Sequence, residues 1–445
     1  MTRKIAVIVV GEGRSGRPGR ATAPDVRPLL GRPAAGYVLD AVSALGPQSL
    51  HFVHPEGDRE VSEEIAAWYA SRKKKPSLGF AAYKPSARPE GGRIPAALLH
   101  AGSILGKPLK GDVLLVASTQ ALLRSASLKS MVSAHRKHGC SLTLESAGDG
   151  KADTGTALVR AEDVLPLLPG LGRGRKGPVY DSLVELLVSM GKKVGIYESP
   201  APDESRALTR PADFERAARI LQAIKNEALA RRGVVFLDSR TAWVDWDATV
   251  GPGTVVYPSV FIEGATRIGR GCRIYPHVHI TNSRIGDEVR ILDCTVIDDS
   301  VLETGVQAGP FSRLRPGTVI RAGSRVGNFV EMKNTVFGPR SKAQHLSYLG
   351  DSLVEEGVNI GAGTITCNYD GFRKSRTHIE AGVFIGSGTE LIAPVRVGKG
   401  AYVAAGSTIS RDVSPECLVI ARARQMEKPG WVLQKIRERK KARKP

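Results

Sequence analysis

Branched aliphatic residues recur at every sixth position through long parts of the second half of the chain. An α-helix requires a spacing near 3.6 residues and an exposed hairpin strand alternates with period two, so neither explains this pattern. Six-residue spacing predicts a parallel β-helix in which each hexad supplies one short strand and one turn, with the aliphatic side chain pointing to the axis. The positions are Val244, Val250, Val256, Ile262, Ile268, Ile274 and Ile280, then Ile285, Ile291 and Ile297 after a one-residue slip, and finally Ile379, Ile385, Leu391, Val397, Val403 and Ile409.

Turn residues and one interruption complete the pattern. Glycine pairs such as Gly251 and Gly253 stand between the hexads, where they allow the chain to turn a corner. The repeat is interrupted over residues 338–351, so we expect a loop to leave the prism there. The expected loop carries His345 and Tyr348, which makes it a candidate functional segment.

Length and composition limit the class of protein. A chain of 445 residues exceeds one compact core, so we expect two domains. No apolar stretch is long enough to span a bilayer, and the first apolar run is too short for a secretion signal. The five cysteines form no close pairs, which argues against a disulfide framework and against a metal site. These features predict a cytoplasmic protein without membrane insertion.

The net charge of +20 indicates anionic partners. Nucleic acid, coenzyme A and sugar phosphates all fit a charge of this sign, and charge alone does not choose among them. Seven basic residues lie between positions 435 and 444, with Glu438 as the single acidic one. We interpret residues 426–445 as a solvated basic tail, with a helix end that binds a phosphate as the alternative.

Four segments make the second half resemble a known family. They are residues 311–317 (FSRLRPG), 327–333 (GNFVEMK), 345–351 (HLSYLGD) and 358–371 (VNIGAGTITCNYDG), joined by 385–387 (IGS) and 403–406 (VAAG). The family is the bacterial bifunctional enzyme that acetylates glucosamine-1-phosphate and then uridylates the product to UDP-N-acetylglucosamine, a precursor of peptidoglycan and lipopolysaccharide. The resemblance implies a left-handed β-helix over residues 235–425 and a homotrimer, with acetyl-CoA and an amino-sugar phosphate as partners and no nucleic acid.

The resemblance also assigns the acetyl-transfer residues. An amine attacks a thioester only when it is neutral, so a general base must take its proton. His345 matches the family's catalytic base, and Glu331 resembles the carboxylate that orients it. The positions that resemble the substrate site are Arg315, Lys333, Tyr348, Asn359, Asn368 and Lys374, and those that resemble the acetyl-CoA site are Ala362, Tyr369, Ser387, Ala405 and Arg422. In the family, the N–H that falls at Ala362 stabilises the oxyanion.

Residues 1–230 alternate strand-like and helical stretches, which predicts an α/β domain with a largely parallel sheet, of the Rossmann-like nucleotidyltransferase class. Strands are expected at 4–10, 50–53, 113–116 and 193–197, and helices at 34–45 and 213–232. Gly11 and Gly13 follow the first strand and resemble the family's nucleotide loop.

This half departs from the family at the residues that carry uridylyl transfer. Arg14-Ser15 replaces a Thr-Arg pair, Pro24-Asp25 stands near an expected Pro-Lys pair, and a substrate-binding segment is missing between Ser146 and Thr154. Ser118-Thr119 aligns with the Gly-Asp that holds the metal, and Thr209 aligns with the second ligand, an asparagine. Hydroxyl groups do not replace carboxylates as ligands for Mg²⁺, so we do not expect this ion to bind as it does in the family.

Three hypotheses follow from the sequence. The first is an N-acetyltransferase with a degenerate nucleotidyltransferase-like domain that has lost its uridylyltransferase activity. The second is an enzyme that keeps both activities and uses other metal ligands. The third is a non-catalytic trimeric scaffold or regulator. The sequence favours the first, because the residues around His345 are intact and the metal-binding carboxylate is missing.

Overall fold

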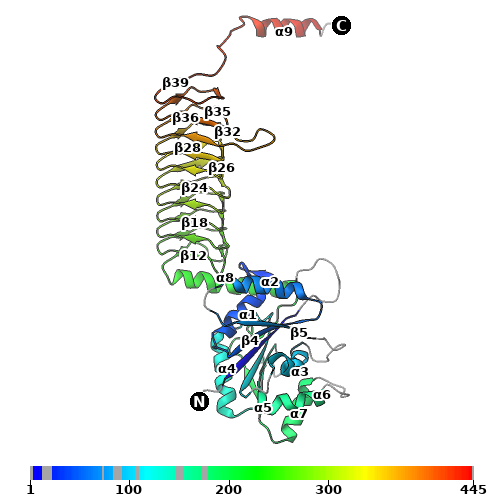
Figure 1. The fold of residues 1–445 in the computed structure, drawn as a ribbon. Coiled ribbons are helices and arrows are strands. Elements are labelled where there is room, and N and C mark those ends of the chain that lie inside the picture. The colour runs from blue at the N-terminus through cyan, green and yellow to red at the C-terminus, as the bar shows by residue number, and fades with distance from the viewer. Residues whose placement is uncertain are drawn as a thin grey trace. The chain divides into compact units, whose positions relative to one another are not determined.

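The computed structural model describes residues 4–12, 23–72, 75–83, 93–106, 110–146, 155–171 and 179–442. The chain forms two compact units, the first comprising Met1–Ala228 with Val244–Asp247 and the second Leu229–Trp243 with Ala248–Pro445 (Figure 1). The nucleotide-loop residues Gly13, Arg14 and Ser15, and most of the segment between Ser146 and Thr154, lie outside the described residues.

A seven-stranded sheet forms the centre of the first unit, in the order β5-β4-β1-β6-β8-β7-β9. Only β8 runs antiparallel to its neighbours β6 and β7, and the other pairs are parallel. All six residues of β1 are buried, as expected for a strand covered on both faces. The bounds are β1 Ile5–Val10, β4 Ser49–Pro55, β5 Leu78–Tyr83, β6 Asp112–Ala117, β7 Leu142–Ser146, β8 Thr156–Arg160 and β9 Val194–Glu198, which confirms the four predicted strands.

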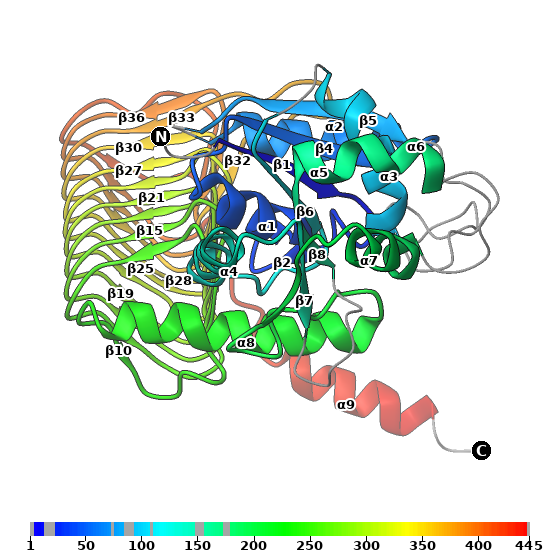
Figure 2. The same ribbon diagram turned by 90° about the horizontal axis from the view of Figure 1, so that it is seen from below.

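Helices cover both faces of this sheet (Figure 2). One apolar cluster contains side chains from one face of β1 and β4. Helices α1 (Ala34–Ser43), α2 (Arg59–Ala70) and α4 (Ser125–His138) pack on that face. Helices α3 (Arg93–Leu105), α5 (Ala161–Val164), α6 (Leu168–Leu171) and α7 (Val179–Ser189) pack on the other face, where the 3₁₀ turn η1 (Leu165–Leu167) joins α5 to α6. Helix α8 (Pro211–Ala230) and α1 confirm the two predicted helices.

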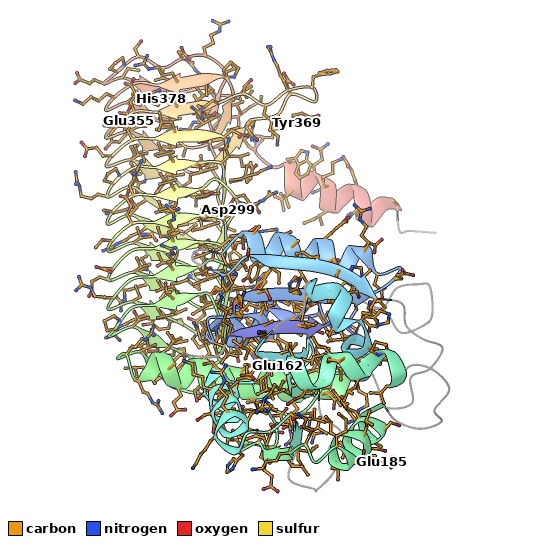
Figure 3. The ribbon with its side chains drawn as sticks, turned by 60° about the horizontal axis from the view of Figure 1, so that its bottom comes forward. Glu162, Glu185, Asp299, Glu355, Tyr369 and His378 are labelled. Carbon is orange, nitrogen blue, oxygen red and sulfur yellow. The ribbon has the colours of Figure 1, made fainter. Side chains whose placement is uncertain are left out.

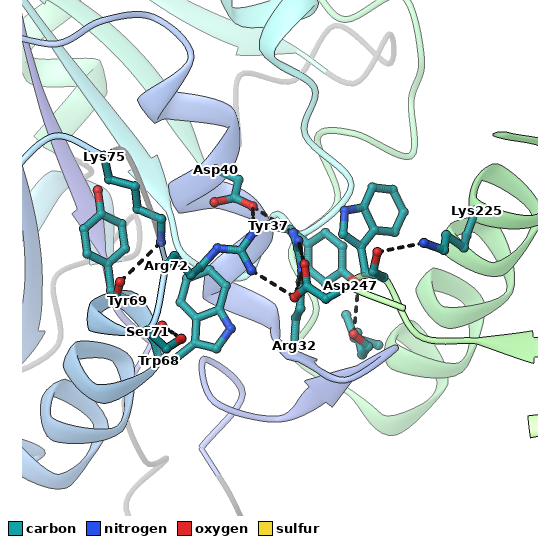
Figure 4. A network of polar contacts seen from close by, with 12 residues as sticks. Arg32, Tyr37, Asp40, Trp68, Tyr69, Ser71, Arg72, Lys75, Lys225 and Asp247 are labelled. Carbon is teal, nitrogen blue, oxygen red and sulfur yellow. Dashed lines mark hydrogen bonds and ion pairs between the residues drawn. The ribbon is translucent and has the colours of Figure 1, made fainter. Parts of the chain in front are cut away.

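An alternating charge network holds the segment Val244–Asp247 within the first unit (Figure 4). Arg32 begins the second strand of the hairpin formed by β2 (Pro28–Leu29) and β3 (Arg32–Pro33), and it contacts both Asp40, at 2.7 Å, and Asp247. Arg72 pairs with the same two carboxylates, at 2.9 Å each. Because the Arg32 side chain is only 6% exposed, both of its carboxylate partners are needed to offset its desolvation.

The second unit is built from three parallel sheets whose strands follow one another in turn, one strand of each sheet per coil (Figure 1). The first sheet holds β10 Val235–Phe236, β13 Val255–Val256, β16 Arg273–Ile274, β19 Arg290–Ile291, β22 Gln307–Ala308, β25 Arg325–Asn328, β28 Lys342–His345, β31 Asn359–Ile360, β34 Phe384–Ile385, β37 Tyr402–Val403 and β39 Leu418–Val419. The second holds β11 Trp243–Val244, β14 Phe261–Glu263, β17 His279–Thr281, β20 Val296–Asp298, β23 Arg313–Leu314, β26 Glu331–Lys333, β29 Tyr348–Gly350, β32 Ile365–Cys367, β35 Glu390–Ile392 and β38 Thr408–Ile409. The third holds β12 Thr249–Val250, β15 Arg267–Ile268, β18 Arg284–Ile285, β21 Val301–Leu302, β24 Val319–Ile320, β27 Val336–Phe337, β30 Ser352–Val354, β33 Thr377–Ile379 and β36 Val395–Val397.

The aliphatic residues that recur every sixth position form the core of this prism. All of them are buried, and neighbours in register such as Ile262 and Ile280 stack on each other in successive coils. This confirms the predicted fold class, a nucleotidyltransferase-like α/β domain followed by a left-handed parallel β-helix. The five cysteines are free.

The structure corrects the predicted interruption at residues 338–351. This segment stays within the prism and supplies β28 and β29, with Phe337, Ala343 and Leu349 buried in the core. The repeat was missed because Phe337 and Ala343 are not branched aliphatic residues. The segment that leaves the prism is instead 368–376, since Ser352 pairs with Thr377, a step of 25 residues where neighbouring coils take 17 or 18.

The basic C-terminal segment contains one helix. Helix α9 (Trp431–Ala442) is exposed along its described side chains, which agrees with the interpretation of this segment as solvated. None of the described helices combines the length and the apolar character that crossing a bilayer requires.

Candidate active site

His345 lies at the corner between the first and second sheets of the β-helix. Register places one residue of each coil at the same point of this corner: Asn328, His345, Ala362, Ser387 and Ala405. We refer to these five positions as the His345 edge. It brings the predicted base and three of the predicted acetyl-CoA residues into one column.

The partner of His345 is Asn328, one coil below. The His345 Nδ1 lies 2.8 Å from the Asn328 Oδ1, and since an amide oxygen only accepts hydrogen bonds, Nδ1 carries the proton. The Nε2 atom of the neutral ring is then left with its lone pair, as a general base requires. Glu331, predicted to orient His345, instead accepts a bond of 2.8 Å from the Arg315 guanidinium.

Three predicted substrate cations gather on the second sheet, which adjoins this edge. Arg315 and Lys333 occupy equivalent positions in adjacent coils of the second sheet, and Lys374 reaches them from the segment 368–376. The neighbouring ammonium group of Lys374, and then the charge of Arg315, lower the pKa of Lys333. Like charges gathered in this way form a site for a multiply charged anion.

Gly350 lies beneath two other predicted substrate residues. A Cβ atom on Gly350 would approach the Tyr348 hydroxyl to 2.6 Å and the Asn368 amide nitrogen to 2.7 Å, so the bare backbone lets both side chains close over it. The Asn368 amide donates to Asp351 at 2.5 Å. Partial burial raises the pKa of Asp351, but the bonds from Asn334 and Asn368 and the two lysine charges outweigh it and lower the pKa overall.

Asn359 is set apart from the other predicted substrate residues. It projects from β31 in the first sheet, next to Lys342 of the coil below, whereas Arg315, Lys333 and Tyr348 belong to the second sheet. The chain therefore presents its predicted substrate residues on two faces that meet at the His345 edge.

The predicted acetyl-CoA residues offer free hydrogen-bond donors. The N–H groups of Ala362, Ser387 and Ala405 bond no backbone acceptor in the described part of the chain, while the Ala362 and Ser387 carbonyls accept bonds from the next coil. The Arg422 side chain passes 3.8 Å from the point where a Cβ atom on Gly406 would stand, which places it at the upper end of the column. Tyr369 stands on the projecting segment, with its hydroxyl bonded to the Gly371 carbonyl (Figure 3).

The strand ends of the first unit form a second cluster of polar residues, which is closed. Asp25 is fully buried and accepts bonds from the Ser118 hydroxyl and from the N–H of Glu12. Ser118 and Thr119 are also fully buried, and the Leu208 N–H donates to the Thr119 carbonyl at 3.0 Å. The two stretches that align with the family's metal ligands, 118–119 and 208–209, are thus neighbours.

A buried carboxylate continues this cluster. Glu145 accepts bonds from the Gln120 amide, at 3.2 Å, and from the Ser205 hydroxyl, at 3.1 Å, and Gln120 accepts one from Thr156. Burial is the largest cause of a raised pKa at Glu145, and its three polar neighbours only reduce the shift. Within the described ranges, no group of three His, Cys, Asp or Glu side chains is placed to hold a metal ion.

The sequence analysis missed Asn328 and Asp351. A signal for Asn328 exists, because it precedes His345 by 17 residues, the length of one coil, within a segment that already matched the family. Asp351 gives no comparable signal, since its role depends on Asn368 from the projecting segment.

Parts of the chain are similar to known proteins. The family described as bacterial transferase hexapeptide (six repeats) matches residues 376–411. Two solved structures, a nucleotidyl transferase from Methanothermobacter thermautotroptrophicus and 4-diphosphocytidyl-2C-methyl-D-erythritolsynthase from Anaerococcus prevotii, cover 50% and 49% of this chain and 99% of their own. Their identities are 18% and 12% and their TM-scores 0.38 and 0.39. By fold, the chain is of the class that joins a nucleotidyltransferase-like domain to a hexapeptide-repeat β-helix.

Proteins that match the chain over nearly its whole length identify one family within this class. The chain is 33% identical to the bifunctional protein GlmU of Thermodesulfovibrio yellowstonii, across 97% of this chain and 100% of that protein. It is 34% identical to the GlmU of Pelobacter propionicus, across 98% and 99%, and 41% identical to that of Carboxydothermus hydrogenoformans, across 65% of each. The chain belongs to the GlmU family.

Proposed function

We propose that this protein transfers the acetyl group of acetyl-CoA to the amine of glucosamine-1-phosphate, in the biosynthesis of UDP-N-acetylglucosamine. The observation that carries the proposal is the gathering of three cations on the second sheet, which begins at the corner where His345 stands with its Nε2 atom available as a base. Membership of the GlmU family and the segments around His345 supply the acceptor and the donor.

His345 Nε2 takes a proton from the acceptor's amine as the amine attacks the thioester carbon. The C–N bond forms, the C–S bond breaks, and the departing CoA thiolate takes up a proton. As His345 becomes an imidazolium, its Nδ1–H continues to donate to Asn328. This contact holds the ring in one tautomer and orientation through the reaction.

The remaining residues bind and polarise the two substrates. Arg315, Lys333 and Lys374 hold the phosphate dianion, with arginine suited to paired oxygen contacts and lysine acting as a point charge. The free N–H of Ala362, one coil above His345, donates to the oxyanion of the tetrahedral intermediate. Ser387, Ala405, Arg422 and Tyr369 bind the CoA chain.

A second copy of the chain completes this site in our proposal. Asn359 and Tyr348 lie on different faces of one prism, and a neighbouring subunit that supplies one of them would let a single acceptor contact both. We propose a cytoplasmic homotrimer with a site at each junction between subunits.

The test is release of free CoA from acetyl-CoA and glucosamine-1-phosphate by the purified protein. A panel of amino sugars with and without the phosphate identifies the acceptor, since the phosphorylated sugars should react far faster. If the wild-type protein releases no CoA with any phosphorylated amino sugar, the proposal is wrong.

For the first unit, we propose that uridylyl transfer has been lost. At the edge where the family holds Mg²⁺, the only described side chain with negative charge against Ser118 is Asp25, and its Oδ1 already accepts two protein bonds. The hydroxyl groups of Ser118 and Thr119, which stand where the family has its metal-binding carboxylate, do not fit Mg²⁺, which prefers carboxylate oxygens.

Membership of a family of bifunctional proteins favours the alternative that both activities persist. Incubation with UTP, Mg²⁺ and N-acetylglucosamine-1-phosphate separates the two. We expect no pyrophosphate above background, in a preparation that releases CoA at full rate. Pyrophosphate release at a catalytic rate would show that other residues bind the metal.

A further inference from the structure

A cleft of about 870 Å³ opens in the first unit, at the end of the sheet opposite to Asp25 and Ser118. Lys4 and Ile5, at the start of β1, line one side of it, and the turn after α1 contributes Leu45, Gly46 and Gln48. The outer face of α4 lines the other side with Lys129, Val132, Ser133, Arg136 and Lys137. Its volume lies within the range of about 300–1,000 Å³ that is typical of small-molecule sites.

The walls of the cleft combine an apolar floor with a cationic rim. Ile5 and Val132 are buried at its base, whereas Lys4, Lys129 and Lys137 are exposed. Among the described residues these three lysines have no carboxylate partner, and the fourth cation, Arg136, pairs with Asp112 at 2.6 Å. Like charges that share one concave surface raise its potential, because the low-dielectric walls focus the field.

Stabilisation of helix α4 explains only two of the four cations around the cleft. Arg136 and Lys137 lie in the last turn of α4, where cations interact favourably with the helix dipole. Lys129 lies two turns earlier, and Lys4 comes from the neighbouring strand, so the dipole accounts for neither. An anion in the cleft would interact with all four cations at once.

We propose that this cleft binds an organic polyphosphate, of which a nucleoside triphosphate is the type. The phosphates lie against Lys4, Lys129, Arg136 and Lys137, and the uncharged part of the ligand covers Ile5, Leu45 and Val132. The Gln48 amide and the Ser133 hydroxyl are the hydrogen-bonding groups of the same wall. The proposal is independent of the acetyl transfer, because no residue of the cleft belongs to the β-helix.

The experiment measures ATP binding to the full-length protein by calorimetry, with inorganic tripolyphosphate as a second probe. Two double variants change the net charge equally: Lys129→Glu with Lys137→Glu in the cleft, and Arg273→Glu with Arg290→Glu on the first sheet of the β-helix. CoA release and thermal unfolding show that each variant is folded.

We expect the cleft variant to bind ATP at least about tenfold more weakly than wild type, the change that about 1.4 kcal/mol produces, and the control variant to match wild type. Tripolyphosphate should bind the wild type more weakly than ATP, since it leaves the apolar floor uncovered. ATP affinity that is equal in the two variants, or no binding to the wild type at millimolar ATP, would overturn the proposal.

Discussion

Polar residues at the strand ends of the first unit are buried, whereas those of the candidate site in the second unit are partly or fully exposed. In the first unit, Asp25, Ser118 and Thr119 are fully buried, and Asp25 and Ser118 bond each other. In the second unit, His345 and Lys374 are exposed, and Lys333 is held close to two other cations.

This difference separates strand ends whose polar groups are available to a ligand from strand ends whose polar groups are not. A buried polar group must be satisfied by its own protein, and one that already is has nothing to offer a substrate. Lys374 and Arg315 lower the pKa of Lys333, so the charged form of Lys333 is less favourable there until an anion binds. By this criterion we propose that the β-helix keeps a working site, whereas Asp25 and Ser118 are buried and bonded to each other within the first unit.

Removal of the proposed general base is the strongest test of the site in the β-helix. His345→Ala should lower the rate of CoA release by a factor of about 10²–10⁴, the usual contribution of a general base. His378→Ala is the matched control, because His378 pairs with Glu355 at 2.9 Å on another face of the β-helix. An equal loss of activity in the two variants would show that the His345 substitution acts through the fold.

Removal of a cation tests the phosphate site. Lys333→Ala and Lys374→Ala should each raise the KM for the amino-sugar phosphate by about 10–100-fold, since a hydrogen bond to a charged group contributes about 1.5–3 kcal/mol. The KM for acetyl-CoA should not change. Arg284→Ala, which removes an exposed cation of β18 on the third sheet, serves as the control. A rise in both KM values would indicate a distorted site in place of a lost phosphate contact.

Replacement of Asn328 tests the contact that orients His345. Asn328→Ala should lower kcat by about tenfold, a smaller loss than deletion of the base itself. Asn328→Asp places a negative charge beside the imidazole, which should shift the ascending limb of the pH–rate profile to higher pH. A profile that does not move in Asn328→Asp would show that Asn328 has no influence on the base.

The fold could be predicted from sequence wherever one rule determined the local structure. The six-residue spacing identified the β-helix, because every branched aliphatic residue in the series must occupy the axis. The same rule misplaced the projecting segment, since Phe337 and Ala343 fill core positions that the pattern reserved for branched residues. Core volume, which one sequence does not show, decides which other side chains fit those positions.

The residues that belong to the candidate site could be predicted from the sequence, but the contacts among them could not. Coil length brings His345 and Ala362 into one column, so their proximity follows from spacing, whereas Ser387 joins the column only because the projecting segment lengthens the next coil. The pairing of Glu331 with Arg315 could not be foreseen, because residues one coil apart have several partners of opposite charge within reach. Lys374 reaches Lys333 only through the conformation of the projecting segment, which no repeat specifies.

The smallest effect concerns stability in the first unit. Burial raises the pKa of Glu145, so the folded state binds this proton more tightly than the unfolded state does, and stability declines as pH rises from the ordinary carboxyl pKa through the raised one. Glu145→Gln carries no titrating group and should lose this decline. The thermal midpoint of the variant minus that of wild type should therefore increase between pH 4 and pH 7, by an amount on the order of a few °C. Glu185→Gln, at an exposed position of α7, should follow wild type at every pH. If the midpoints of Glu145→Gln and wild type differ by the same amount at every pH, this carboxyl is accessible to solvent. The contrast between the two units would then be weaker than the burial of Asp25 and Ser118 indicates.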